Sequence, residues 1–219
     1  CATAPRAYLD LNRGAEELDP ALISGVIRRG TNPRVSSGLG VIPRVVSGGR
    51  QIYRGKISYS EAQTRLRGFW FPYHAELDRL LQGAHTLFGS AILLDCHSMP
   101  HEAIQSLCRN MPIKPEIVLG DRFGAAASGG IVDRLEQLFL DAGLKVTRNK
   151  PFAGAYIAQH YGRPSQNQHV VQIEIDRALY MNESNLRPNR NFTHLKSLLG
   201  RVIAGITDLG QSDLPLAAE

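Results

Sequence analysis

Apolar residues recur along this chain with two spacings, and each spacing predicts a different kind of element. Spacings of three and four residues predict helices over 59–81, 131–142 and 192–209. Short apolar runs bounded by turn residues predict strands over 6–11, 51–57, 90–95, 116–119, 144–147 and 170–175. Because strands alternate with helices, we expect an α/β fold with a largely parallel sheet.

Local residue choices predict where some of these elements begin and end. Ser60 is expected to cap the first helix. Pro72 should kink or break the same helix, because proline has no backbone N–H to donate. Gly143 should end the second helix. Residues 14–50 are rich in Gly, Pro, Ser and Arg, so we expect a long surface loop there, with one helical turn near 19–22.

Composition places the chain among folded globular proteins. Of its 219 residues, 43% are hydrophobic and 21% are charged, which excludes a disordered, collagen-like or coiled-coil chain. No apolar run approaches the roughly 18–20 residues that cross a bilayer, so we expect no membrane partner. Three irregularly spaced cysteines favour a reducing, cytoplasmic compartment over a disulfide scaffold. We expect a single domain over residues 1–219.

The net charge of +5 comes from 25 Lys and Arg residues against 20 Asp and Glu residues. Most basic residues are scattered; they cluster only at Arg28–Arg29 and over 187–190, without interleaved aromatic residues. Nucleic-acid binding is therefore not expected, because it needs a continuous basic surface. A small anionic substrate explains the excess of arginine equally well.

Polar residues follow the apolar strand at 90–95, where ligands bind in open α/β sheets. His97 could ligate a metal through one ring nitrogen while the Asp95 carboxylate orients the other. The alternative is a histidine whose ring is satisfied by local hydrogen bonds. Position alone leaves both interpretations open.

A second polar group lies within the apolar strand at 170–175. Alternation places Gln172, Glu174 and Asp176 on one face, and burying three polar groups is costly unless they are paired. Glu174 is the best general-base candidate in the chain, since a carboxylate can take a proton from an activated water. The alternative is an edge strand whose polar face is solvated.

Two further segments combine turn residues with groups that bind anions. Asn12 and Arg13 follow the predicted strand at 6–11, and the planar fork of arginine can hold a carboxylate at two points. The alternative is an ordinary strand-to-loop turn. The segment 149–156, followed by Arg163, could cap a pocket, or it could be a structural turn.

Two common catalytic motifs are missing from the sequence. The segment 120–124, GDRFG, lacks the Gly-Lys-Ser/Thr ending of a phosphate-binding loop. Ser98 follows His97, but no Gly-x-Ser-x-Gly nucleophile elbow is present.

Taken together, the ordered motifs resemble the N-formylglutamate amidohydrolase family. The longest matches are PRAYLDLNR at 5–13, LDCHSMP at 94–100 and HVVQIEIDRALYM at 169–181. Shorter matches lie at 72–74, 118–123, 149–156 and 160–164. The resemblance covers most of residues 5–183.

The resemblance implies a three-layer α/β fold, similar to zinc carboxypeptidases and aspartoacylases, with a mixed, mostly parallel sheet and helices on both faces. It also implies site roles for nine residues. Carried over, Glu174 is the general base, His97 is a zinc ligand, and Arg6 polarises the scissile carbonyl. The substrate-binding residues are then Asn12, Arg13, Asn149, Tyr156, Arg163 and Gln172.

In the related enzymes two further zinc ligands, a histidine and a carboxylate, come from upstream of the Asn-Arg pair. Only eleven residues precede Asn12 in this sequence, so we expect this chain to lack an N-terminal portion. The leading hypothesis is a zinc-dependent amidohydrolase that cleaves the formyl amide of N-formyl-L-glutamate. The alternatives are hydrolysis of another small anionic N-acyl amino acid, and a metal-free carboxylate-binding domain.

Overall fold

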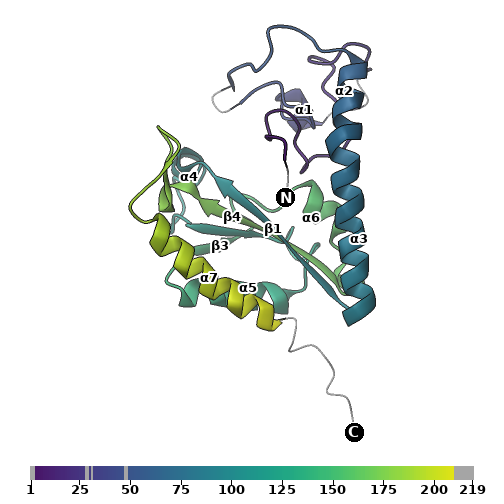
Figure 1. Cartoon of the computed structure of the whole chain (residues 1–219). Coiled ribbons are helices and arrows are strands. Elements are labelled where there is room, and N and C mark those ends of the chain that lie inside the picture. Colours follow the sequence, from purple (N-terminus) through teal and green to yellow (C-terminus); the bar gives the residue numbers. More distant parts are fainter. Residues whose placement is uncertain (1–2, 28–29, 31, 47–48, 210–219) are drawn as a thin grey trace. The chain divides into compact units, whose positions relative to one another are not determined.

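The structure is a computed structural model, and it describes residues 3–27, 30, 32–46 and 49–209 (Figure 1). The chain divides into two compact units, residues 1–80 and 81–219, and each unit is described by itself. Cys1 and the Arg28–Arg29 pair lie outside the described residues. The single domain expected over the whole chain stays a prediction.

The first unit consists of turns and loops followed by a run of helix. The helical elements are α1 (Pro33–Ser36), α2 (Tyr59–Arg65), a π-helical turn (Leu66–Trp70) and α3 (Phe71–Phe88), which continues into the second unit. The strands predicted over 6–11 and 51–57 are wrong. Residues 6–8 form a turn, and within 51–57 only the first and last residues form isolated bridges. A strand needs a neighbour with which it exchanges a ladder of hydrogen bonds, and the described part of this unit offers none.

The segment 14–50 is more buried than a surface loop. Leu22, Ile23, Val41 and Ile42 are at most 1% exposed and form part of the core. The turn expected near 19–22 is present, since the carbonyl of Asp19 accepts from the backbone N–H groups of Leu22 and Ile23. Weak periodicity did not reveal this burial, because an irregular segment buries residues without a fixed spacing.

The cap of α2 lies two residues before the predicted position. The side chain of Ser58, not Ser60, accepts a hydrogen bond from the backbone N–H of Glu61 at 3.1 Å. Ser60 lies inside the helix, where its side chain cannot cap the first turn.

We expect Ser58→Ala to lower the free energy of unfolding by about 1 kcal/mol, because it leaves a helix N–H without its acceptor. Ser60→Ala is the matched control, and it should change stability by less than half as much. Urea denaturation of both variants checks this. Equal losses would contradict the assignment of Ser58 as the cap.

Pro72 does not break the helix, because the helix adapts before it. The backbone N–H of Phe71 donates to the carbonyl of Leu66, five residues back, which completes a π-helical turn. Such turns insert an extra residue into a helix. The helix then continues through Pro72 to Phe88.

The second unit is built on a four-stranded sheet of β1 (Ala91–Met99), β2 (Ile117–Gly120), β3 (Val146–Arg148) and β4 (Gln168–Asp176). The strand order is β1-β4-β2-β3. The pairs β1–β4 and β2–β3 are parallel, and the pair β2–β4 is antiparallel. The mixed, mostly parallel sheet is therefore confirmed.

Helices lie on both faces of this sheet, which confirms the three-layer fold. On one face are α5 (Gly129–Asp141) and α7 (Phe192–Leu209), and on the other are α4 (His101–Leu107) and α6 (Tyr156–Tyr161) (Figure 1). The alternation of β2 matches this arrangement, since Leu119 packs with α5 and α7 whereas Val118 packs with Ile104 of α4. The sequence did not predict α4 or α6, because helices of seven and six residues are too short for a periodic pattern.

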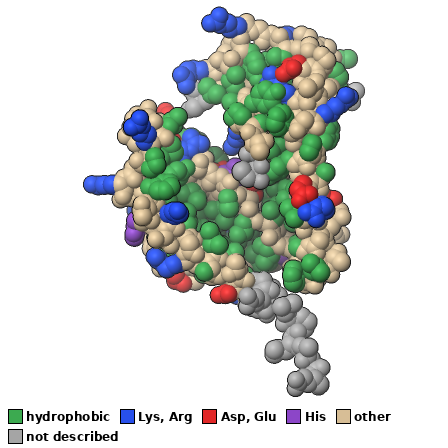
Figure 2. Space-filling model, in the orientation of Figure 1, with side chains coloured by type: hydrophobic (Ala, Val, Ile, Leu, Met, Phe, Trp, Pro, Cys, Tyr) green, Lys and Arg blue, Asp and Glu red, His purple; other side chains and the backbone are tan. Residues whose placement is uncertain are grey.

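Short elements complete the second unit. They are two 3-10 helices (Pro164–Gln166 and Arg177–Leu179) and a small antiparallel ribbon of β5 (Met181–Asn182) and β6 (Arg187–Pro188). Cys96 and Cys108 are free thiols. Among the described helices, none has both the length and the apolar character to cross a membrane. Figure 2 shows Lys and Arg side chains dispersed over the face in view.

Candidate active site

The two strongest candidates from the sequence, His97 and Glu174, lie on neighbouring strands in the same register. In the parallel pair β1–β4, Asp95 is the partner of Gln172 and His97 is the partner of Glu174. Partners in a ladder project to the same face, so these four residues line one face of the sheet. The edge-strand alternative for Glu174 is wrong, because β4 lies between β1 and β2.

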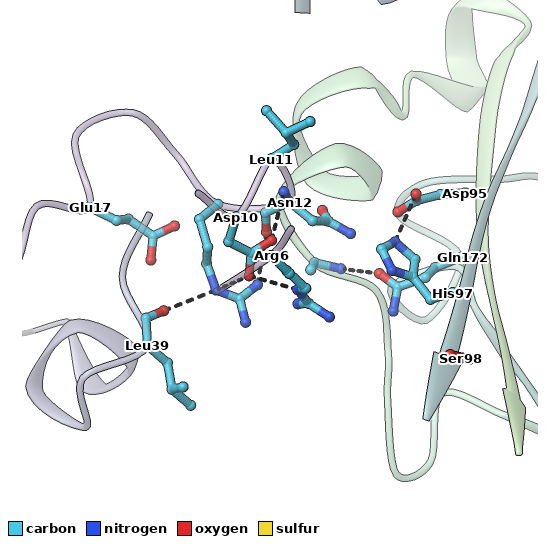
Figure 3. A network of polar contacts seen from close by, with 12 residues as sticks. Arg6, Asp10, Leu11, Asn12, Glu17, Leu39, Asp95, His97, Ser98 and Gln172 are labelled. Atoms are coloured by element: carbon cyan, nitrogen blue, oxygen red, sulfur yellow. Dashed lines mark hydrogen bonds and ion pairs between the residues drawn. The ribbon is translucent and has the colours of Figure 1, made fainter. Parts of the chain in front are cut away.

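Asp95 orients the imidazole of His97. Nε2 of His97 lies 2.8 Å from Oδ1 of Asp95, and both side chains are largely buried (Figure 3). A carboxylate in this position fixes the ring and its tautomer, and this is the usual support for a histidine that binds a metal through its other nitrogen. The hydrogen bond of His97 to Asp95 is therefore compatible with a role of His97 as a metal ligand.

Asp95→Asn should lower any activity that depends on His97 by about 10- to 100-fold, as expected when the partner that orients a functional histidine is lost. Asparagine keeps the shape, so the melting temperature should change little. Asp141→Asn, on the exposed side of α5, is the control for the same chemical change. A loss of stability as large as the loss of activity would show that Asp95 is structural.

The carboxylate of Glu174 is held by a chain of two hydrogen bonds. The side-chain amide of Gln172 donates to Oε1 of Glu174 at 2.9 Å. The carbonyl oxygen of the same amide accepts from the backbone N–H of Ala155, also at 2.9 Å. Because Gln172 is 5% exposed and Glu174 is 8% exposed, the direction of the carboxylate is well fixed. Gln172 therefore acts on Glu174 as a positioning residue.

Asn149 ties two loops together beside these residues. Its side-chain oxygen accepts from the backbone N–H groups of Asp121 and Phe123, both at 3.2 Å. Its amide nitrogen donates to Oδ1 of Asp121 at 2.5 Å. These contacts favour the structural-turn interpretation of 149–156 for Asn149 itself.

The structure places Tyr156 and Arg163 at opposite ends of α6. Tyr156 follows Ala155 directly and stacks on His160, with ring centroids 5.0 Å apart. The guanidinium of Arg163 donates to the carbonyl of Gly162, and its backbone pairs with Gln168 at the start of β4. Tyr156 therefore lies next to the Gln172 contact, whereas Arg163 is not brought together with Glu174.

A second histidine–carboxylate pair, which the sequence analysis did not identify, lies one step further along the strands. Nδ1 of His101 is 2.7 Å from Oδ2 of Asp176, and Asp176 is buried. Asp176 shares the face of Glu174, so the alternation of 170–176 already indicated a buried partner for it. His101 lies in α4, and no periodic pattern predicted that helix.

In the first unit, Asp10 joins the two arginines expected in the site. Its carboxylate lies 3.0 Å from Nε of Arg6 and 3.9 Å from Nε of Arg13 (Figure 3). The guanidinium of Arg13 also donates to the carbonyls of Leu39 and Asn12. Burial lowers the pKa of Arg13 and the Asp10 carboxylate opposes that shift, so the arginine remains charged at neutral pH.

The expected substrate-binding residues of this unit lie together in one turn. Asn12 is 3% exposed, and its backbone N–H donates to Oδ1 of Asp10 at 3.0 Å. Arg6 is half exposed, with 54% of its side-chain surface accessible. Their combination with His97 and Glu174 of the second unit stays a prediction.

The described residues do not complete a metal site. Among them, no group of three His, Cys, Asp or Glu side chains is placed to hold one ion. A catalytic zinc generally takes three protein ligands, and His97 would supply one. This part of the chain therefore does not by itself fit a catalytic zinc.

Comparison with known proteins gives consistent matches. The protein-family model described as N-formylglutamate amidohydrolase matches residues 1–181 of this chain. N-formylglutamate deformylase of Pseudomonas aeruginosa is 32% identical over 148 residues, which are 66% of this chain and 54% of that protein. The Pseudomonas putida deformylase is 31% identical over 186 residues, 82% of this chain and 62% of that protein. This chain thus spans a little over half the length of these relatives.

Solved structures agree with the fold. The crystal structure of N-formylglutamate amidohydrolase from Ralstonia eutropha JMP134 matches with a TM-score of 0.85 and 32% identity, over 95% of this chain and 74% of that one. A gene product of Agrobacterium tumefaciens matches with a TM-score of 0.58 and 15% identity, over 93% and 67% of the two chains. At that identity the second match supports the fold alone.

Proposed function

This chain belongs to the N-formylglutamate amidohydrolase family, and from this premise we propose that it hydrolyses the formyl amide of N-formyl-L-glutamate. The products are formate and L-glutamate. The names of the two Pseudomonas relatives support this substrate. The observation that carries the proposal is the pairing of His97 with Glu174 across β1 and β4, beside a buried chain of hydrogen bonds that orients the carboxylate.

In this proposal Glu174 moves the protons. Its carboxylate takes a proton from the attacking water, whose oxygen bonds to the formyl carbon. As the carbon–nitrogen bond breaks, the same carboxyl returns the proton to the leaving nitrogen. A carboxylate suits this role because it is a base in the first step and an acid in the second. The hydrogen bond from Gln172 would keep it aimed at the reacting atoms.

The proposed substrate is an anion, and arginines would recognise it. Arg13 and Asn12 would bind a substrate carboxylate, and Arg6 would polarise the formyl oxygen. In the second unit, Tyr156 at the start of α6 is a further proposed substrate contact. The Asp10 carboxylate supports the assignment of the two arginines, because it lies 3.0 Å from Nε of Arg6 and 3.9 Å from Nε of Arg13 and so keeps the two guanidinium groups close together.

Zinc is proposed from the family resemblance. His97, oriented by Asp95, is the residue of this chain that would bind it. A bound zinc ion lowers the pKa of a bound water and polarises a carbonyl oxygen. Since the described residues do not complete its ligand set, the proposed reaction assigns no step to the metal.

Formate release tests the proposal directly. The protein, expressed from its natural gene, is incubated with N-formyl-L-glutamate, with and without a chelator, and formate and metal content are measured. We expect formate and glutamate in equal amounts, and loss of activity with the chelator. Activity only on N-acetyl-L-glutamate would favour another N-acyl amino acid as substrate. Binding of glutamate without any turnover would favour a carboxylate-binding domain.

A further inference from the structure

The turn that follows β2 holds residues in a backbone conformation that side chains rarely adopt. Arg122 and Phe123 have φ angles of +55° and +57°, and Gly124 follows with +86°. Left-handed backbone costs free energy at any residue except glycine, and a bulky residue there is an outlier. Asn149 stabilises the turn by accepting from Asp121 and Phe123. Strain of this kind is concentrated at functional sites.

This turn lies beside the carboxylate that we propose as the base. Gly120, two residues before Arg122, is the register partner of Gln172 in the β2–β4 pair. The stem of Arg122 lies against Gly154, where an added Cβ would be 3.3 Å from its Cγ. The next residue, Ala155, donates to Gln172, which in turn donates to Glu174. Arg122 therefore lies against Gly154, the residue before Ala155, and Ala155 begins the hydrogen bonds that orient Glu174.

Arg122 is partly exposed, and its side chain forms no ion pair with the described residues. Two other arginines of this unit are engaged: Arg148 pairs with Asp133 and Glu136, and Arg177 donates to Ser98. A guanidinium without a protein partner is open to a ligand, and a carboxylate would bind it at two points.

We propose that Arg122 binds the side-chain carboxylate of the substrate and so selects N-formyl derivatives of acidic amino acids. This inference rests on the proposed function. The substrate N-formyl-L-glutamate carries two carboxylates, and one arginine can hold only one of them at two points. Arg122 supplies a cation for the side-chain carboxylate from within the unit that carries Glu174.

The test compares two substrates that differ only in charge. N-formyl-L-glutamine has the shape of N-formyl-L-glutamate but carries an amide in place of the side-chain carboxylate. In Arg122→Gln we expect kcat/KM for N-formyl-L-glutamate to fall by about 10- to 100-fold, mainly through KM, as for a lost hydrogen bond to a charged group. The value for N-formyl-L-glutamine should change less than threefold. An equal loss for both substrates would overturn the proposal.

Two variants separate recognition from folding. Arg201→Gln removes the same charge from the exposed side of α7, on the other face of the sheet, and should leave both substrates unaffected. Arg122→Lys keeps the charge without the planar fork, so its preference for the charged substrate should lie between wild type and Arg122→Gln. If Arg122→Lys loses as much as Arg122→Gln while both remain folded, charge recognition is not the role of Arg122.

A binding measurement keeps the inference testable if the proposed hydrolysis fails. Calorimetry of wild type with glutarate and with its monoamide needs no turnover. We expect tighter binding of glutarate, and we expect Arg122→Gln to remove that preference. If no formate is released but glutarate still binds more tightly than its monoamide, the proposed hydrolysis is rejected and the proposed role of Arg122 in binding a carboxylate is retained. Equal binding of the two compounds, or no binding, would overturn the role of Arg122.

Discussion

Replacing Glu174 with glutamine should lower kcat for formate release by about 100- to 10,000-fold, the usual contribution of a positioned general base. Glutamine has nearly the shape of glutamate and can still accept the hydrogen bond from Gln172. It cannot take a proton from water. Because the site keeps its shape, KM and the melting temperature should change little.

The effect of this substitution is measured by steady-state kinetics together with thermal unfolding. Glu102→Gln, at the exposed start of α4, is the matched control and should keep wild-type kcat. Unchanged kcat in Glu174→Gln would remove the proposed mechanism. A fall in kcat that accompanies loss of folded protein would assign Glu174 to structure instead of chemistry.

Replacing Gly120 with alanine should destabilise the protein more than Ser58→Ala does. An added Cβ would lie 2.6 Å from the backbone nitrogen of Gly154 and 2.7 Å from the carbonyl carbon of Ala153. Both contacts are with backbone, which cannot rotate away as a side chain can. The strand or the loop must shift, at a cost of about 1–3 kcal/mol or more. For a protein of this size that lowers the melting temperature by several degrees.

The same substitution should also reduce activity, because the displaced loop carries Ala155, the donor to Gln172. Gly129→Ala is the control, since an added Cβ at Gly129 meets nothing within 4 Å at the start of α5. Thermal unfolding and kinetics of both variants check this. If Gly120→Ala is as stable as wild type, the close approach of β2 and the 153–155 loop is not maintained in solution.

Elements with long apolar patterns were predictable from the sequence. The C-terminal helix was predicted over 192–209 and is α7 (Phe192–Leu209). The helix predicted over 131–142 is α5 (Gly129–Asp141), and Gly143 ends it with φ of +80°. Each buries one face on the sheet, so the packing reinforces the pattern that the sequence already contains.

Elements that depend on distant partners were not predictable in the same way. The segment 6–11 has the composition of a strand but no described strand beside it, so it forms a turn. The segment 51–57 does not form a strand for the same reason. Strand propensity describes how a residue fits a half-buried sheet, and it cannot show whether a sheet is there.

By itself, the sequence determined which residues are candidates for the chemistry. Alternation within 170–176 placed Gln172, Glu174 and Asp176 on one face, and the strand predicted over 90–95 marked His97. The end predicted for that strand is wrong, because β1 (Ala91–Met99) continues past Asp95 and contains His97. Only the tertiary structure decided how they meet. The register that pairs His97 with Glu174, and the left-handed turn that presents Arg122, depend on contacts between residues far apart in the chain. The local sequence pattern determines on which face of a strand a side chain lies, whereas long-range packing determines which residues it contacts.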